Sequence, residues 1–210
     1  MTNPLFQLFE NEKIVLKIQQ RLPYLFQLAE LESSRAGKIG MEVGSLREKI
    51  IVALLIYQFG EENVETELPI TEPEADVKLY NNPISIKTIT DSSLRGVKLI
   101  WTVDALKSKE FLESYQPLCD MLLIQINWQD YGGFYYFPLS AQKRTFDQIG
   151  REKYIKLPKA GTNPRGIELT REAMENLVRD RESKSIPIFW HRTEISYDPY
   201  KRWIDLWRED

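Results

Sequence analysis

Residues 76 to 87 constrain the fold more than any other part of the chain, because polar and apolar side chains alternate there on both sides of a turn signal. The apolar positions are Val77, Leu79, Ile84 and Ile86. Period-two alternation is typical of a β-strand with one buried face, and Asn81-Asn82 before Pro83 favours a tight turn. The segment therefore predicts an antiparallel hairpin with an apolar face on a core and a polar face above it.

The turn position predicts which residues of the hairpin face each other. A two-residue turn at Asn81-Asn82 sets Tyr80 opposite Pro83, and counting back along both strands sets Asp76 opposite Lys87. Directly opposed residues have Cβ atoms about 4.5–5.5 Å apart, so Asp76 and Lys87 are expected to share the polar face. The alternative interpretation is an ordinary solvated face with a cross-strand ion pair.

The remaining chain alternates between helical and strand patterns. Helices are expected at about 12–30, with a kink or break at Pro23, and at 45–60, 105–115, 140–150 and 170–180. Further strands are expected at 97–103, 121–128, 134–137 and 186–190, with a tight turn through Gly132-Gly133 and an exposed glycine-rich loop at 33–44. This order predicts an α/β fold with a central mixed β-sheet flanked by helices.

Length and composition limit the classes of protein to which the chain can belong. Its 210 residues, 42% of them hydrophobic, are enough for one core, so we expect a single domain over residues 1–210. A net charge of −3 argues against a protein that coats polyanions, and there is no run of about 18 apolar residues to cross a membrane. The lone Cys119 cannot form an internal disulfide, and we expect a cytoplasmic protein without a membrane partner.

A predicted helix that begins near Ser45 supplies a further acidic residue. Ser45 is a possible N-cap, Glu48 follows three residues later, and Ile50 to Tyr57 is wholly apolar. We therefore expect a buried helix that places Glu48 at the edge of the core, near the sheet. Glu48 is alternatively the acid of a capping box.

Two carboxylates and a lysine are sufficient for magnesium-dependent phosphodiester hydrolysis. Carboxylate oxygens bind Mg²⁺ while leaving positions open for water and phosphate, and a lysine orients or activates the attacking water. Asp76 and Glu48 are the candidate carboxylates, and Lys87 is the candidate lysine.

These residues resemble a known family. Glu48, then Pro73 and Asp76, then Ser85-Ile86-Lys87 resembles the PD-(D/E)xK core of type II restriction endonucleases. The order and spacing, with the glycine-rich segment 37–44, are most similar to the ThaI-like endonucleases, which recognise CGCG. The resemblance implies that Glu48, Asp76 and the backbone carbonyl of Ile86 bind Mg²⁺ and that Lys87 serves the nucleophile. It also implies cleavage of double-stranded DNA to 5′-phosphate and 3′-hydroxyl ends.

The sequence departs from the superfamily motif at two positions. Ser85 stands where the motif usually has Asp or Glu, and Asp76 follows Pro73 by three residues instead of one. A hydroxyl is a poorer magnesium ligand than a carboxylate, so the sequence leaves open whether one or two metal ions bind.

Two segments outside the expected catalytic core, about residues 45–128, are candidates for DNA contact. The segment 33–44 contains Lys38 and Met41, and Met41 is either a wedge between base pairs or a residue packed on the core. The segment 156–166 contains Lys159, Asn163 and Arg165, and Arg165 is a candidate for reading a guanine edge. The surrounding residues 142–166 carry seven basic side chains against two acidic ones, which is also typical of a solvated surface.

Two competing functions remain at this stage. A non-cleaving duplex-DNA-binding protein on the same fold is one, although Lys87 argues against it. A nucleotide-processing α/β enzyme is the other, although the sequence has no GxGxxG or GxxxxGK[ST] loop. A nuclease with one such site per chain needs two copies to cut both strands of a palindrome, so a homodimer is expected.

Overall fold

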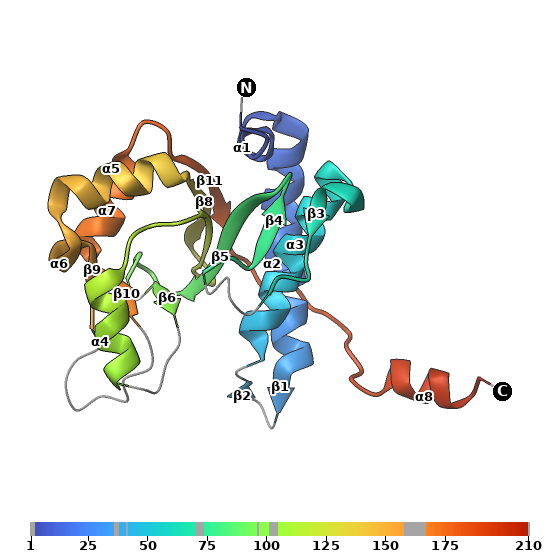
Figure 1. The fold of residues 1–210 in the computed structure, drawn as a ribbon. Coiled ribbons are helices and arrows are strands. Elements are labelled where there is room, and N and C mark those ends of the chain that lie inside the picture. The colour runs from blue at the N-terminus through green and yellow to red at the C-terminus, as the bar shows by residue number, and fades with distance from the viewer. Residues whose placement is uncertain are drawn as a thin grey trace.

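The structure, a computed structural model, describes residues 3–35, 38–40, 42–69, 74–95, 97–100, 105–157 and 167–209. A six-stranded mixed sheet forms the centre of the fold, in the order β11-β8-β7-β5-β4-β3 (Figure 1). Its strands are β3 (Val64–Glu65), β4 (Val77–Leu79), β5 (Asn82–Thr90), β7 (Asp120–Ile126), β8 (Tyr131–Phe137) and β11 (Lys184–Phe189). The predicted α/β class with a central mixed sheet is confirmed.

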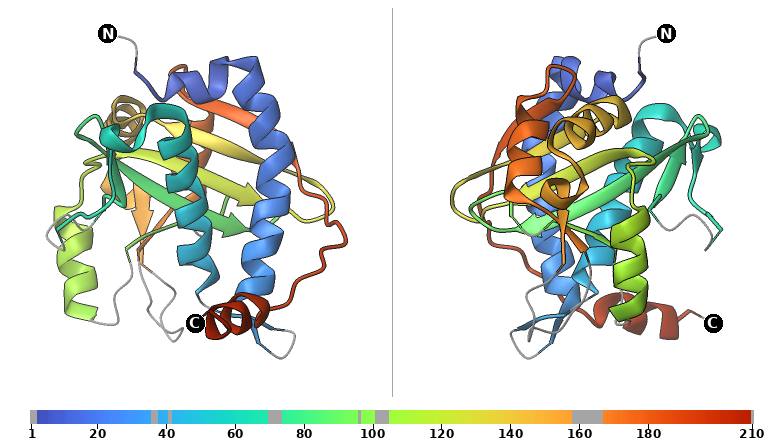
Figure 2. Two further views of the ribbon diagram at one scale, coloured as in Figure 1. Left: turned by 90° about the vertical axis from the view of Figure 1, so that its right-hand side faces the viewer. Right: turned by 60° about the vertical axis from the view of Figure 1, so that its left-hand side comes forward.

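Helices cover both faces of this sheet (Figure 2). One face packs against α1 (Phe6–Glu10), α2 (Glu12–Ser33) and α3 (Val43–Phe59), and the other packs against α7 (Arg171–Arg179), with α5 (Leu139–Ile149) and α6 (Arg151–Tyr154) beside it. The side chains of β7 alternate between the two cores that these helices cover. Leu122 and Ile124 belong to the core beneath α1, α2 and α3, whereas Met121 and Leu123 belong to the core beneath α7. A strand buried on both faces reads as a continuous apolar run, as β7 does.

The β4–β5 hairpin corrects the predicted register. Lys78 pairs with Pro83 and Leu79 pairs with Asn82, so the two turn residues are Tyr80 and Asn81, at φ +48° and +63°. Two successive residues with positive φ form the turn type that matches the twist of paired strands. Continuing this register sets Asp76 opposite Ser85 and diagonal to Lys87. Because the shift moves Lys87 by two positions along its strand, it leaves Asp76 and Lys87 on one face.

The predicted turn through Gly132-Gly133 is also wrong, because both glycines lie inside β8. The chain turns earlier, between β7 and β8, where Gln129 has φ +71°. A Cβ on Gly132 would lie 2.2 Å from the carbonyl oxygen of Gln125 and 2.7 Å from Nε1 of Trp190. The close approach of β8 to its neighbours therefore requires the glycine.

Helices α2 and α3 begin and end differently from the sequence expectation. Helix α2 is one helix of 22 residues that keeps Pro23 inside it. The glycine-rich segment is not wholly irregular, because β1 (Ser34–Arg35) pairs with β2 (Lys38–Ile39). Helix α3 already begins at Val43, so Ser45 lies within it and is not its N-cap.

The remaining elements lie around this frame. A three-stranded sheet in the order β6-β10-β9 consists of β6 (Lys98–Ile100), β10 (Ile167–Leu169) and β9 (Ile155–Lys156). The other helices are η1 (Glu61–Asn63), α4 (Ala105–Ser114) and α8 (Lys201–Trp207). Among the described residues, no helix is long and apolar enough to cross a membrane.

Candidate active site

Asp76, just before β4, is the centre of a polar cluster on the hairpin. Its Oδ2 accepts hydrogen bonds from the backbone N–H of Ile86 at 2.6 Å, from Nζ of Lys87 at 3.2 Å and from Oγ of Ser85 at 3.3 Å. Within the described part of the chain, no residue donates to the other oxygen, Oδ1. The three donors hold the carboxylate in one orientation and leave one oxygen open.

Lys87 and Ser85 lie on the same face of β5 as this carboxylate. The ion pair of Lys87 with Asp76 is largely withdrawn from solvent, and Ser85 is fully buried. Ile84 and Ile86, which alternate with them along β5, belong to the core on the opposite face. The predicted polar cluster above an apolar floor is confirmed.

The backbone N–H of Ile86 also faces the carboxylate of Asp76. Because N–H and C=O of one strand residue leave on the same side of the strand, and the N–H of Ile86 points to Asp76, its carbonyl oxygen points there as well. A main-chain oxygen therefore lies on the carboxylate side of β5.

Glu48 reaches this cluster from α3. It is half-buried, and its pKa is raised, mostly by burial and further by the charge of Asp76, while Lys87 opposes the shift. Asp76 and Lys87 are therefore the two hairpin residues whose charges act on Glu48. The capping-box interpretation of Glu48 is wrong, since α3 has no side-chain cap and begins at Val43.

A buried ion-pair network beside Glu48 fixes α3 against the sheet. Arg47, next to Glu48 in sequence, donates to Oε1 of Glu30 on α2 at 2.5 Å and to Oγ1 of Thr90 at the end of β5 at 3.1 Å. Glu30 also accepts from Nε1 of Trp128 at 2.9 Å and pairs with Arg192 at 2.7 Å. Burial lowers the pKa of Arg47, and the carboxylate of Glu30 opposes that shift.

This network was not predicted from the sequence, although a signal for it exists there. Arg47 precedes Ile51 and Leu55 at intervals of four residues, so it continues the buried stripe of α3. Glu30 stands in the same relation to Phe26 and Leu22 on α2. A charged residue that continues an apolar stripe is predicted to be buried and therefore to need a partner of opposite charge.

A second carboxylate near Lys87 was also missed. Glu74 is buried, and burial raises its pKa to about 7, while the charge of Lys87 lowers it. Cys119 is its neighbour, with Sγ 3.9 Å from the backbone oxygen of Glu74. Burial raises the pKa of Cys119 to about 12, which favours the protonated thiol.

Of the residues expected to contact DNA, only Lys38 is among the residues that the structure describes. Lys38 is exposed on β2. Met41, Lys159, Asn163 and Arg165 lie outside the described residues. Of the basic residues in 142–157, Arg144, Lys153 and Lys156 form ion pairs with acidic residues, which reduces the free positive charge of this region.

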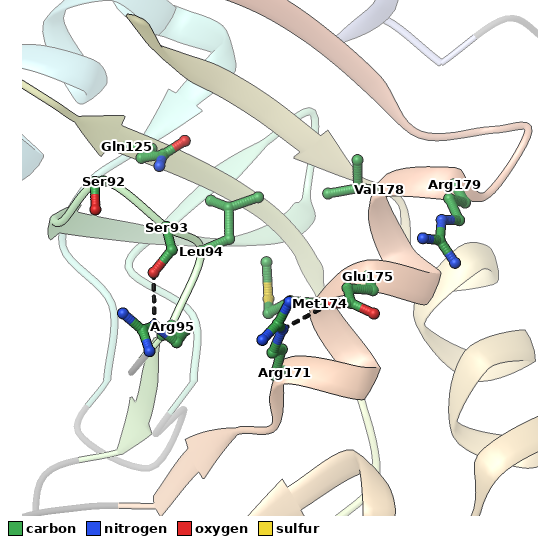
Figure 3. Close-up of a pocket in the computed structure, with 10 residues that line it drawn as sticks. All are labelled: Ser92, Ser93, Leu94, Arg95, Gln125, Arg171, Met174, Glu175, Val178 and Arg179. Carbon is green, nitrogen blue, oxygen red and sulfur yellow. Dashed lines mark hydrogen bonds and ion pairs between the residues drawn. The ribbon is translucent and has the colours of Figure 1, made fainter. Parts of the chain in front are cut away.

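A separate hollow of about 590 Å³ opens beyond the end of β5 (Figure 3). It lies between residues 92–95 and α7, with Arg95, Arg171 and Arg179 at its wall. Arg171 is paired with Glu175 at 2.7 Å, and Arg95 donates to Ser93 at 2.6 Å. Neither Asp76 nor Lys87 lines this hollow, so it is distinct from the carboxylate cluster.

Comparison with known proteins assigns the chain to a family. The family model of the restriction endonuclease ThaI matches residues 8–209. The chain belongs to the ThaI restriction endonuclease family. ThaI-family proteins are site-specific nucleases, so the polar cluster lies in a member of an enzyme family.

A solved structure is similar over nearly the whole chain. It is described as "Restriction endonuclease in complex with substrate DNA", is 61% identical and has a TM-score of 0.91. The match covers 98% of this chain and 99% of that one. A search of curated proteins found no match.

Proposed function

We propose that the chain is a type II restriction endonuclease of the PD-(D/E)xK superfamily, with Mg²⁺ as its cofactor. Its substrate is double-stranded DNA, cut at a short palindromic site with the sequence CGCG. The observation that carries this proposal is the meeting of Asp76, Lys87 and Glu48 in one cluster in a member of the ThaI family. Residues 1–210 act as one nuclease domain, with the catalytic core at about 45–128.

The donor set of the cluster suits magnesium. Glu48, Asp76 and the carbonyl of Ile86 offer only hard oxygen atoms, which Mg²⁺ prefers. Oδ1 of Asp76 is open among the described residues, and a bound cation would relieve the repulsion that contributes to the raised pKa of Glu48. No group of three or more potential side-chain ligands occurs in the described residues, so water and phosphate oxygens would complete the coordination. When bound, Mg²⁺ offsets the negative charge that develops on the phosphate.

The residues around the metal ligands position the nucleophile. Lys87 holds the attacking water through Nζ, and Oδ2 of Asp76 at 3.2 Å keeps that amine in place. Ser85 and the N–H of Ile86 hold the carboxylate itself. Water forms a bond to phosphorus while the bond to the 3′ oxygen breaks, which leaves 5′-phosphate and 3′-hydroxyl ends.

The DNA contacts in this proposal come from segments 33–44 and 156–166. Lys38, Lys159 and Asn163 contact the DNA, and Arg165 reads a guanine edge. Met41 inserts between base pairs, since pyrimidine-purine steps such as CG are the flexible ones. Arg165→Ala is expected to relax specificity at one base position, and Met41→Ala to weaken binding and DNA distortion without lowering the melting temperature.

Cutting both strands of a palindrome requires two catalytic clusters related by a two-fold axis. We therefore propose a homodimer on DNA, working in the cytoplasm.

The decisive experiment is cleavage of matched duplexes, one with a central CGCG and one with CCGG. With Mg²⁺, only the first should be cut, and its ends should ligate without prior phosphorylation. With EDTA, no cleavage should occur. Binding of the CGCG duplex without cleavage in Mg²⁺ would instead identify a non-cleaving DNA-binding protein, and cleavage of both duplexes would remove the proposed specificity.

A further inference from the structure

The C-terminal arm, residues 191–209, leaves the body of the protein and ends in α8 (Figure 1). Its root is fixed: Trp190 is fully buried, Arg192 pairs with Glu30, and the backbone of Thr193 exchanges two hydrogen bonds with the side chain of Gln27. Beyond this point the chain crosses to α8, and no residue of α8 is buried. The arm is therefore anchored at one end only.

Helix α8 presents an apolar face to solvent. Trp207 is 89% exposed, and four further apolar side chains on or beside the helix are exposed as well: Tyr200, Trp203, Ile204 and Leu206. Trp203 and Trp207 are four residues apart, so they lie on the same face of the helix. Asp205 pairs with Lys201 on the helix and with Arg208 just beyond it, and the guanidinium of Arg202 lies over the ring of Trp203. A contiguous exposed apolar face of this kind marks an interaction surface.

A second uncovered apolar surface lies between α2 and α3. It is a groove of about 290 Å³ with an almost wholly apolar wall, formed from α2 by Ile18, Leu22 and Leu25 and from α3 by Ile50, Ala53, Leu54 and Tyr57, with Lys17 and Arg21 at its rim. The sequence predicts a fully buried α3, and that prediction is wrong. Only Arg47, Ile51, Leu55 and Phe59 are buried, and Tyr57 is 62% exposed. A helix that is apolar all round needs covering on its second side.

The two surfaces lie on the same side of the molecule. When the right-hand side of Figure 1 is turned to the viewer, α2 and α3 lie at the front of the body and α8 comes forward from it (Figure 2). Every copy of the chain carries both the arm and the groove. In a dimer with a two-fold axis, the arm of each copy would therefore cover the groove of the other copy, so that both apolar surfaces are buried.

We propose that α8 of each copy packs into the α2–α3 groove of a second copy, so that exchanged arms hold the dimer together. The inference rests on the proposed nuclease function, which needs two catalytic clusters. Each buried aromatic side chain contributes roughly 150–250 Å², so Tyr200, Trp203 and Trp207 supply a large part of the roughly 800 Å² per partner of a standard interface. The opposed α2–α3 faces supply the rest.

The test compares two interface variants with a matched control by analytical ultracentrifugation over a range of concentrations. Trp203→Ser/Trp207→Ser removes the arm's face, and Ala53→Glu/Tyr57→Glu places charges in the groove at exposed positions. Each should weaken dimerisation at least a hundredfold. Lys201→Ser/Arg208→Ser, on the polar side of α8, should leave it unchanged. Wild-type association that neither interface variant weakens would overturn the proposal.

A disulfide experiment identifies which chain the arm occupies. Chains with Trp207→Cys and one affinity tag are mixed with chains carrying Ala53→Cys and another tag, then oxidised. A product joining the two tags is expected. If Trp207→Cys/Ala53→Cys in one chain closes only within that chain, α8 folds back on its own groove, and the proposal is wrong.

Cleavage is measured separately, which keeps the two proposals distinguishable. A wild-type dimer with exchanged arms that cuts no DNA contradicts the nuclease proposal alone. A wild-type monomer that cuts both strands contradicts the exchanged arms and the proposed homodimer but leaves the nuclease activity itself standing.

Discussion

The β4–β5 hairpin and the C-terminal arm differ in how their apolar and charged residues are covered. Around the hairpin, every isoleucine of the apolar face is covered by the chain's own helices, and Asp76 has three donors from its own strand pair. On α8, the large apolar residues are exposed, whereas Asp205 forms ion pairs with Lys201 and, just beyond the helix, with Arg208. The difference teaches that contacts within one chain order the polar cluster of the hairpin, whereas they leave the apolar face of α8 uncovered.

The largest expected effect is on chemistry at the hairpin. Lys87→Ala should lower the cleavage rate about 10²–10³-fold, as is typical when one preorganised charged group is removed from an active site. Binding of the CGCG duplex should remain, because Lys87 acts on the phosphate and not on bases. Lys49→Ala, an exposed lysine next to Glu48, is the control and should cut normally. Equal activity of the two variants, measured under single-turnover conditions, contradicts the assigned role of Lys87.

The second-largest expected effect is on stability, and it concerns the buried ion pair of Glu30 with Arg47 near the root of the arm. Glu30→Ala leaves Arg47 buried without its carboxylate, and breaking a buried pair of this kind costs about 3–5 kcal/mol. The free energy of unfolding in urea should fall by that amount, whereas Glu32→Ala, an exposed neighbour, should change it little. A loss no larger than that of the control would show that the network does not hold α3 in place.

A pH effect is expected from Glu74. Its pKa is raised from 4.5 to about 7 in the folded protein, so folding favours the protonated form. The resulting stabilisation is complete below about pH 4.5, shrinks as the pH rises and is lost above about pH 7. Glu74→Gln should remove this dependence. The melting temperature of the wild type, measured in EDTA, should therefore decline relative to the variant between pH 4.5 and 7.5, and parallel curves would contradict it.

The smallest effect tests whether the hairpin turn is merely structural. Asn81 has φ +63°, a conformation that glycine adopts without a steric cost. Asn81→Gly should raise the free energy of unfolding by no more than about 1 kcal/mol and leave cleavage unchanged. A fall in cleavage with unaltered stability would show that the turn does more than connect two strands.

The alternation of polar and apolar residues predicted that Asp76 and Lys87 share one face. It did not predict which residues of β4 and β5 pair with each other. Asn81-Asn82 before Pro83 is the stronger turn signal, yet the turn uses Tyr80, whose ring meets Phe59 edge-on at 6.3 Å. That contact joins residues far apart in sequence, so local propensity cannot reveal it. The prediction that Asp76 and Lys87 share a face is still correct, because a register shift of two positions leaves each side chain on the same face of the sheet.

Helix α3 shows a different limit of sequence analysis. The apolar run Ile50–Tyr57 correctly predicts a helix, but the prediction that this helix is fully buried is wrong, because its own chain covers only one side. Glu48 was placed correctly near the sheet, because the stripe of Ile51 and Leu55 orients the helix. The roles of Glu48, Asp76 and Lys87 in catalysis stay predictions.

The parallel pairing of β5 with β7 has a consequence for when the enzyme becomes active during synthesis. Glu48, Asp76 and Lys87 all precede residue 90, but β7 begins only at Asp120, and β11, at the edge of the sheet, ends at Phe189. Pairings between distant segments form late, because the intervening loop must close first. A growing chain therefore carries all three side chains long before it has the sheet that holds them. From the proposed roles of these residues, we expect competence to cut DNA only after β11 has joined the sheet.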